Sequence, residues 1–244
     1  MKTKKNKIYK KQKVSRKTRK TRKTRKIKIN IKKVCYKYKP KNYIFGYGSL
    51  ISSNSSYFTG KGFIGEPIPV ELKKCMGFKR CWVCKNTKRG KLSFLALKKS
   101  KQPKNIRGIL YPIYKCMKNF DKREEGYKKK TIKITKMNRK KIIKELGLKK
   151  LPNYDFNLII YMSNSKEGCL SKKCPISQSY LDVVIDGCME WGEKFTKHFL
   201  KNTEFKDKSG DTFFKLDRNT LEHDKYKIYN ITHKEIDKLL KKYI

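Results

Sequence analysis

The sequence predicts an α+β fold, because strand-like runs fill its first part and helical periodicity marks its later part. Between residues 43 and 161, short apolar and aromatic runs break repeatedly into glycine and turn residues, as they do around short strands. After Pro175, apolar residues recur every three or four positions, as on one face of a helix. Strands and helices do not alternate regularly, so a parallel α/β sheet is not predicted.

The strands are predicted first. Folded sequence begins at Tyr43, where an apolar, aromatic run breaks into glycines and predicts a buried strand that enters a tight loop. A charged turn is predicted at residues 121–126. The other predicted strands are Val70–Leu72, Arg80–Val83, Leu92–Leu97, Gly108–Tyr114, Thr131–Thr135 and Leu158–Tyr161.

Three helices are predicted in the second half of the chain. Asn138–Leu146 is a short helix that Gly147 closes. The longest helix runs from Ile176 to Phe199, with one apolar face about six turns long. The last helix opens with a capping box between Thr232 and Glu235.

Basic residues are concentrated at the start of the chain. The 244 residues, enough for one good-sized core, include 66 basic and 20 acidic side chains and carry a formal net charge of +46. Residues 1–42 hold 21 of the basic side chains and no acidic one. Such a segment cannot bury enough apolar surface to offset the entropy of ordering it. We therefore expect residues 1–40 to be a disordered Lys/Arg-rich arm.

The arm has two interpretations. From Arg16 to Lys26, basic residues fill two of every three positions, so the run repels itself and stays extended. It could be a nuclear-localisation or nucleic-acid-binding arm, held to a polyanion by counterion release from phosphates. It could equally be a solvated tail without a dedicated partner, because a charge run carries no base-reading chemistry.

The cysteines bear on both the compartment and a metal site. The sequence shows neither the apolar core of a secretory signal nor an apolar stretch near the length of a membrane span, about 18 residues. We therefore expect an intracellular, cytoplasmic protein, or a nuclear one through its arm. Free thiols are then the default. Cys81 and Cys84 have the spacing of a redox pair or half a zinc site, with Cys169 and Cys174 as the other half. Thiols on a strand more often pack as apolar groups, so we expect no metal and no cofactor.

Two segments carry candidate chemistry. In Phe45–Leu50, two glycines allow a close backbone approach, so that N–H groups can cradle a carboxylate or a developing oxyanion. In Phe120–Tyr127, the adjacent carboxylates Glu124 and Glu125 enter a glycine turn. Taken singly, the first segment is as well explained by a tight turn and the second by a solvated loop. The three histidines all lie in the last fifth of the chain, which gives Ser–His or Cys–His catalysis little support.

Together the two segments resemble the γ-glutamylcyclotransferase superfamily, including its glutathione-specific ChaC branch. Phe45–Leu50 matches the strand of that family that ends in Tyr-Gly-Ser, and Phe120–Glu124 matches its Leu-Asp-x-x-Glu segment. The chain keeps Arg123 and Tyr127 of the ChaC version but has one glycine between them where that branch has two. Supporting similarities, which extend the resemblance over roughly Tyr43 to Phe205, are Gly77–Arg80 with Trp82, Arg107–Tyr111, and Pro175–Asp182 with Gly187-Cys188.

The resemblance implies a fold. We expect a small, mixed, barrel-like sheet with the Tyr43 strand at its centre and the helix at residues 176–200 packed on it. The domain would span residues 41–205. Residues 206–244 would form a C-terminal extension whose terminal helix packs on the domain.

The resemblance also implies an activity, the release of 5-oxoproline from a γ-glutamyl compound, without a cofactor. Glu124 would transfer the proton, with Glu125 as the alternative. Two rival functions stay open: a catalytically inactive domain of this family that binds a metabolite or partner, and a nucleic-acid-associated basic protein. The residues expected to bind the substrate are Phe45, Gly46, Tyr47, Gly48, Ser49 and Leu50.

Overall fold

The structure is a computed structural model that describes residues 39–60, 64–114, 117–147, 152–163, 170–207, 209–218 and 226–243. All of these residues belong to one compact unit, Ile31–Ile244. The predicted arm therefore lies almost wholly outside the described residues. No helix in the described ranges is long and apolar enough to cross a membrane.

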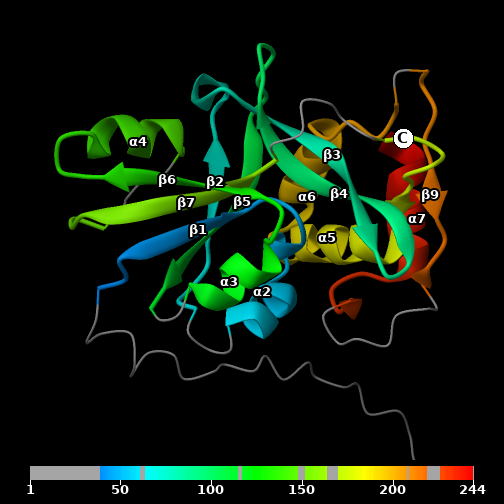
Figure 1. The fold of residues 1–244 in the computed structure, drawn as a ribbon, viewed down its shortest axis with the longest axis horizontal. Coiled ribbons are helices and arrows are strands. Elements are labelled where there is room, and N and C mark those ends of the chain that lie inside the picture. Colours follow the sequence, from blue (N-terminus) through cyan, green and yellow to red (C-terminus); the bar gives the residue numbers. More distant parts are fainter. Residues whose placement is uncertain are drawn as a thin grey trace, which may run out of the picture. The chain divides into compact units, whose positions relative to one another are not determined.

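Strands and helices combine into an α+β fold, which confirms the predicted fold class (Figure 1). The strands are β1 (Asn42–Gly46), β2 (Ile68–Leu72), β3 (Phe78–Thr87), β4 (Gly90–Lys99), β5 (Ile106–Ile113), β6 (Lys128–Ile134), β7 (Phe156–Met162), β8 (Ile176–Ser177) and β9 (Phe214–Lys215). The helices are η1 (Ser49–Ile51), α2 (Ser53–Gly60), η2 (Lys74–Met76), α3 (Lys118–Arg123), α4 (Arg139–Glu145), α5 (Gln178–Glu190), α6 (Glu193–Lys201) and α7 (His233–Tyr243).

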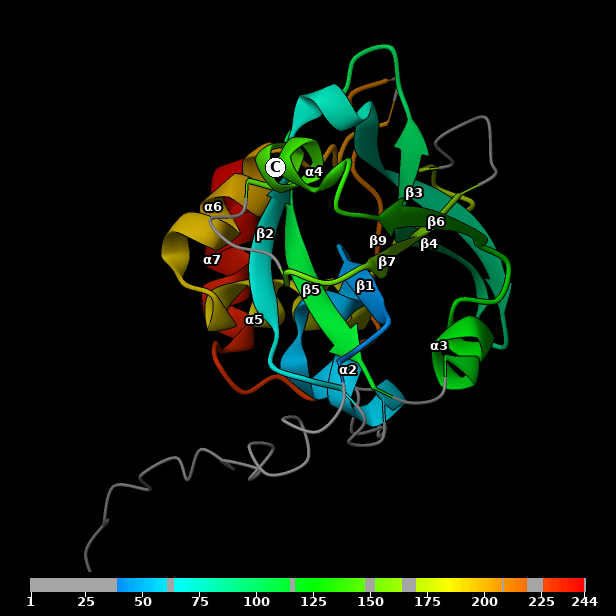
Figure 2. The same cartoon turned by 90° about the vertical axis from the view of Figure 1, so that its left-hand side faces the viewer.

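The strands form two mixed sheets. The five-stranded sheet has the order β2-β5-β1-β7-β6, so β1 lies at its centre as predicted. β1 runs antiparallel to β5 and parallel to β7. The second sheet has the order β3-β4-β8-β9, in which β3 and β4 form an antiparallel hairpin. The two views agree that α5, α6 and α7 lie together on one side (Figure 1, Figure 2).

Both faces of β1 are buried, because side chains alternate across a strand. Ile44 packs into a core with the side chains of α5, α6 and α7. Tyr43 and Phe45 point the other way, into a second core with β7 and α4. The loop that follows β1 is therefore held by a strand packed on both sides.

The single helix predicted from Ile176 to Phe199 is wrong. Ile176 belongs to β8, and the helical residues form two helices, α5 and α6. The break is at Gly192, whose φ of +95° lies in the region that side chains avoid. The apolar periodicity of the sequence continues across this break, because α5 and α6 pack on the same core.

The charged turn predicted at residues 121–126 is only partly correct. Its first three residues belong to α3, and the turn occupies residues 124–126. The α2 helix was not predicted, because its sequence Ser-Asn-Ser-Ser-Tyr-Phe-Thr-Gly has little helical propensity. Tertiary packing supports it instead, since Ser55 and Ser56 are buried.

Residues after 205 belong to the second sheet and to the core described above. β9 pairs with β8, and Ile236 and Leu240 of α7 join the core formed with α5. Arg218 forms ion pairs with Asp182 of α5 and Asp237 of α7, each with an N–O distance of 2.7 Å. The predicted capping box is confirmed, because Thr232 and Glu235 bond each other's backbone N–H groups. The division into residues 41–205 and 206–244 stays a prediction.

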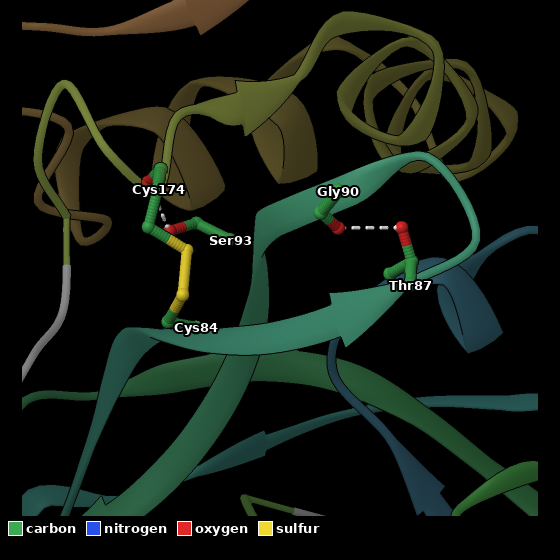
Figure 3. Close-up of a disulfide and its surroundings, with 5 residues drawn as sticks. All are labelled: Cys84, Thr87, Gly90, Ser93 and Cys174. Carbon is green, nitrogen blue, oxygen red and sulfur yellow. Dashed lines mark hydrogen bonds between the residues drawn. A yellow bond between two sulfur atoms is a disulfide. The ribbon is translucent and has the colours of Figure 1, made fainter.

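A disulfide joins Cys84 of β3 to Cys174, just before β8 (Figure 3). Ser93 of β4 lies opposite Cys84 and donates a hydrogen bond of 2.7 Å to the Cys174 carbonyl oxygen. The expectation of free thiols is therefore wrong for these two residues, because the fold brings together cysteines 90 positions apart. Cys81 is buried and packs in a small apolar cluster, as predicted, and Cys169 lies outside the described residues.

Candidate active site

The loop after β1 turns sharply at two glycines. A Cβ atom on Gly46 would lie 2.8 Å from the Leu50 Cβ atom, and one on Gly48 would lie 2.7 Å from the Tyr180 hydroxyl oxygen. Both distances are shorter than real Cβ contacts. The turn then continues into η1, where the Ile51 N–H donates to the Gly48 carbonyl oxygen. The two glycines therefore allow the loop to pack closely against the rest of the site.

Arg80 fixes this loop through its backbone. Its buried guanidinium group donates hydrogen bonds to the carbonyl oxygens of Tyr47, at 3.1 Å, and Arg107, at 2.9 Å, and to the Thr203 hydroxyl group. The Tyr47 hydroxyl group donates to the Tyr161 carbonyl oxygen on β7. The backbone and side chain of Tyr47 are thus held from two directions.

Glu124 lies at the end of α3. Its backbone N–H donates to the Phe120 carbonyl oxygen, and its side chain is 14% exposed. The Arg123 Nε atom is 3.4 Å from a Glu124 carboxylate oxygen. Glu125, the alternative candidate, is exposed to solvent.

Arg123 connects α3 to the glycine loop and to α2. Its guanidinium group donates to the hydroxyl groups of Ser49 and Ser55, each at 2.9 Å, and also to the Thr59 hydroxyl group. It also donates to the Ser55 carbonyl oxygen at 2.7 Å. Arg123 belongs to the motif that resembles the family, but its role as a bridge depends on the helix α2, which the sequence did not predict.

Glu124 and the loop line one cavity of about 840 Å³. All the residues expected to bind the substrate line it except Gly46, and Glu125 does not line it. Side chains that the sequence did not single out as site residues also line it, from β3, β4, α3 and α5. These are Lys85, Asn86, Thr87, Phe94, Leu95, Asn119, Lys122, Tyr180 and Val183.

Burial sets the electrostatics of the cavity. Removal from water raises the pKa of Glu124, and the positive charges of Arg123 and Lys85 offset part of this rise. Burial also raises the pKa values of Tyr47, Tyr127 and Tyr180, so their hydroxyl groups stay neutral at neutral pH. Glu124 is therefore a lining group whose pKa moves toward neutrality, as a general acid–base catalyst requires.

The other candidate chemistry lies elsewhere. His198 contacts Glu71, with 3.6 Å between Nε2 and a carboxylate oxygen, and His233 is 3.5 Å from Asp182. Neither histidine lines the cavity, and His223 lies outside the described residues. Within the described ranges, no group of three or more His, Cys, Asp or Glu side chains could hold a metal ion.

No protein-family model and no curated protein matches the sequence. Solved γ-glutamylcyclotransferases are similar to this chain in structure. A chain named γ-glutamyl cyclotransferase aligns with a TM-score of 0.44 and 14% identity, over 82% of this chain and 98% of that one. An uncharacterized human protein aligns with a TM-score of 0.46 and 14% identity, over 82% and 97%.

A yeast γ-glutamyl cyclotransferase specific to glutathione aligns over 59% of this chain and 79% of that one, with a TM-score of 0.30 and 15% identity.

Proposed function

We propose that this chain is a γ-glutamylcyclotransferase, which converts a γ-glutamyl compound to 5-oxoproline and a free amine. One observation carries the proposal. A carboxyl group with a raised pKa, Glu124, lines the same cavity as the glycine loop Tyr47–Leu50, although the two segments are far apart in the sequence. The sequence motifs of both segments resemble the same family, which supports the same reaction.

The reaction is an intramolecular aminolysis. The α-amino nitrogen of the substrate attacks the γ-carbonyl carbon, a C–N bond closes the five-membered lactam, and the γ-amide C–N bond breaks. Of the three protons of the α-ammonium group, one stays on the lactam nitrogen. The other two pass through Glu124, one after the other, to the departing nitrogen, which leaves as an ammonium group. The equation balances without water, a metal or a redox partner, so one positioned carboxyl group can serve as base and then as acid.

The environment of Glu124 suits both steps. A general base is most effective when its pKa lies near the working pH, and burial moves the pKa of Glu124 in that direction. The Arg123 Nε atom lies 3.4 Å from a Glu124 carboxylate oxygen, and the same guanidinium group donates a hydrogen bond to the Ser49 hydroxyl group of the loop. A fixed carboxylate next to a folded substrate lowers the entropy cost of reaching the transition state.

The loop would hold the γ-glutamyl group. We assign the backbone N–H groups of Gly48–Leu50 to the substrate carboxylate or to the oxyanion that develops on the γ-carbonyl oxygen. The hydroxyl groups of Tyr47 and Ser49 already bond Tyr161 and Arg123. We therefore assign these two hydroxyl groups to holding the shape of the loop, and not to direct contact with the substrate.

An assay for 5-oxoproline tests this proposal. Purified protein is incubated separately with glutathione and with γ-glutamyl-alanine, and 5-oxoproline is quantified by chromatography. We expect turnover of at least one compound, and a loss of about 100-fold or more in Glu124→Gln, the scale of lost general acid–base catalysis. Glu125→Gln is the matched control, because Glu125 is the adjacent carboxylate in the sequence and does not line the cavity.

Two results would contradict the proposal. If Glu125→Gln is crippling while Glu124→Gln is nearly silent, the catalytic residue is wrong. If the folded wild-type chain forms no 5-oxoproline from either compound yet binds them in calorimetry, the chain is a binding domain without this activity.

A further inference from the structure

Lys85 places a positive charge in the wall of the cavity. It lies on β3, next to Cys84, whose disulfide fixes this strand to the segment before β8 (Figure 3). Its Nζ atom lies 3.4 Å from the centroid of the Tyr127 ring and 3.3 Å from the Glu125 carbonyl oxygen. The ammonium group therefore sits over the turn that carries Glu124.

No carboxylate lies within 4.0 Å of this ammonium group among the described residues. An ammonium group has three N–H donors, and the Glu125 carbonyl oxygen takes one of them. Lys85 is partly buried, and burial lowers its pKa while the charge of Glu124 opposes that change. A partly desolvated cation with spare donors is stabilised by an anion that enters the cavity.

The other cations of the cavity are less suited to this role. Arg123 is occupied by Ser49, Ser55, Thr59 and the Glu124 carboxylate. Lys122 is exposed, where water screens its charge. Lys85 is thus the lining cation that is both partly buried and available.

The cavity has room for more than a γ-glutamyl group. Its volume of about 840 Å³ lies in the range of about 300–1,000 Å³ that accommodates a drug-sized ligand. A γ-glutamyl group held between Glu124 and the glycine loop would leave space on the side of β3. The leaving part of the substrate would occupy that space.

We propose that Lys85 binds a carboxylate on the leaving part of the substrate, so that the chain acts on γ-glutamyl amino acids and peptides in preference to γ-glutamyl amines. This inference rests on the proposed cyclotransferase function. Lys85 makes and breaks no bond in the reaction. It sets specificity by pairing with a charge that a γ-glutamyl amine lacks.

A matched pair of substrates tests the proposal. γ-Glutamyl-alanine and γ-glutamyl-ethylamine differ by the carboxylate alone, and the ratio of their kcat/KM values is measured by 5-oxoproline release. We expect the wild type to prefer γ-glutamyl-alanine by about 10- to 100-fold, the scale of a hydrogen bond to a charged group. Lys85→Gln should bring this ratio close to one, and Lys85→Arg should keep part of it.

Lys88→Gln is the control, because Lys88 is exposed on the same hairpin and does not line the cavity; its ratio should equal that of the wild type. A Lys85→Gln ratio equal to the wild-type ratio would overturn the inference, even if both substrates react more slowly, since the lysine would then contact a group common to both. Loss of the preference in Lys122→Gln instead would assign the carboxylate to Lys122. If neither compound yields 5-oxoproline with the wild type, the proposed function itself fails and the inference falls with it.

Discussion

Two adjacent glutamates differ because of where the chain turns. Glu124 ends α3 and faces the cavity, whereas Glu125 is exposed and its carbonyl oxygen accepts a hydrogen bond from Lys85. In the sequence they are equivalent carboxylates before a glycine. Only the position of the turn gives one of them a desolvated environment, and with it a raised pKa.

The pH profile of kcat/KM should report this pKa. The free enzyme needs Glu124 ionised to accept a proton, and its pKa is raised by burial, so activity should fall below a pH that lies above the ordinary glutamate value of about 4.3. Lys85→Gln removes a charge that lowers this pKa, so its acidic limb should move to higher pH. An acidic limb that stays fixed in this variant would show that Lys85 does not act on the titrating group.

At the scale of elements, the loop after β1 is packed against α5. Gly48→Ala would place a methyl group 2.7 Å from the Tyr180 hydroxyl oxygen, and overpacking of this kind costs about 1–3 kcal/mol. We expect Gly48→Ala to lower kcat/KM at least tenfold. Tyr180→Phe in the same chain removes the clashing oxygen and should recover part of that loss. An equal or larger loss in the double variant would indicate that Gly48 matters for another reason.

The disulfide joins β3 to the segment just before β8. The Cys84–Cys174 pair closes a separation of 90 residues, for which the loss of chain entropy in the unfolded state corresponds to about 4.6 kcal/mol. The Cys84→Ser/Cys174→Ser double variant should lose stability of this order in urea unfolding. Reductant should lower the stability of the wild type to that of the double variant. Cys75→Ser, an exposed cysteine, should behave as the wild type, and alkylation of Cys84 in unreduced, denatured protein would contradict the pairing.

For the whole molecule, we expect the activity of the cavity to be independent of the basic arm. Every residue that lines the cavity lies at or after Phe45, while residues 1–38 carry 19 of the 66 basic side chains. Deleting residues 1–38 should change kcat/KM for a small zwitterionic substrate by less than about threefold at physiological salt, where charges beyond about 8 Å are screened. Collapse of activity in a folded truncated chain would place the arm in the site.

The same truncation tests the rival interpretation of the arm. Binding to double-stranded DNA is measured with both chains over a range of salt concentrations. If the arm binds phosphates, the full chain should bind more tightly, with a steeper dependence of affinity on salt. Equal binding by the two chains would support a solvated tail.

The sequence by itself determined the features that depend on local chemistry. Apolar and aromatic runs that break into turn residues located β1 and the strands beside it, and the capping box located the start of α7. Two motifs singled out Glu124 and the loop Phe45–Leu50. Each of these predictions rests on residues a few positions apart, where side-chain periodicity and backbone freedom decide the local conformation.

Tertiary structure decided what distant residues do together. The Ser-rich α2 is helical because it packs in the fold, and Arg123 bridges α3 to the loop through that helix. Cys84 of β3 meets Cys174, and Lys85 of β3 meets the turn after α3, only in the folded chain. No local pattern encodes these contacts, because their energies come from burial and from charges brought close only when the core forms.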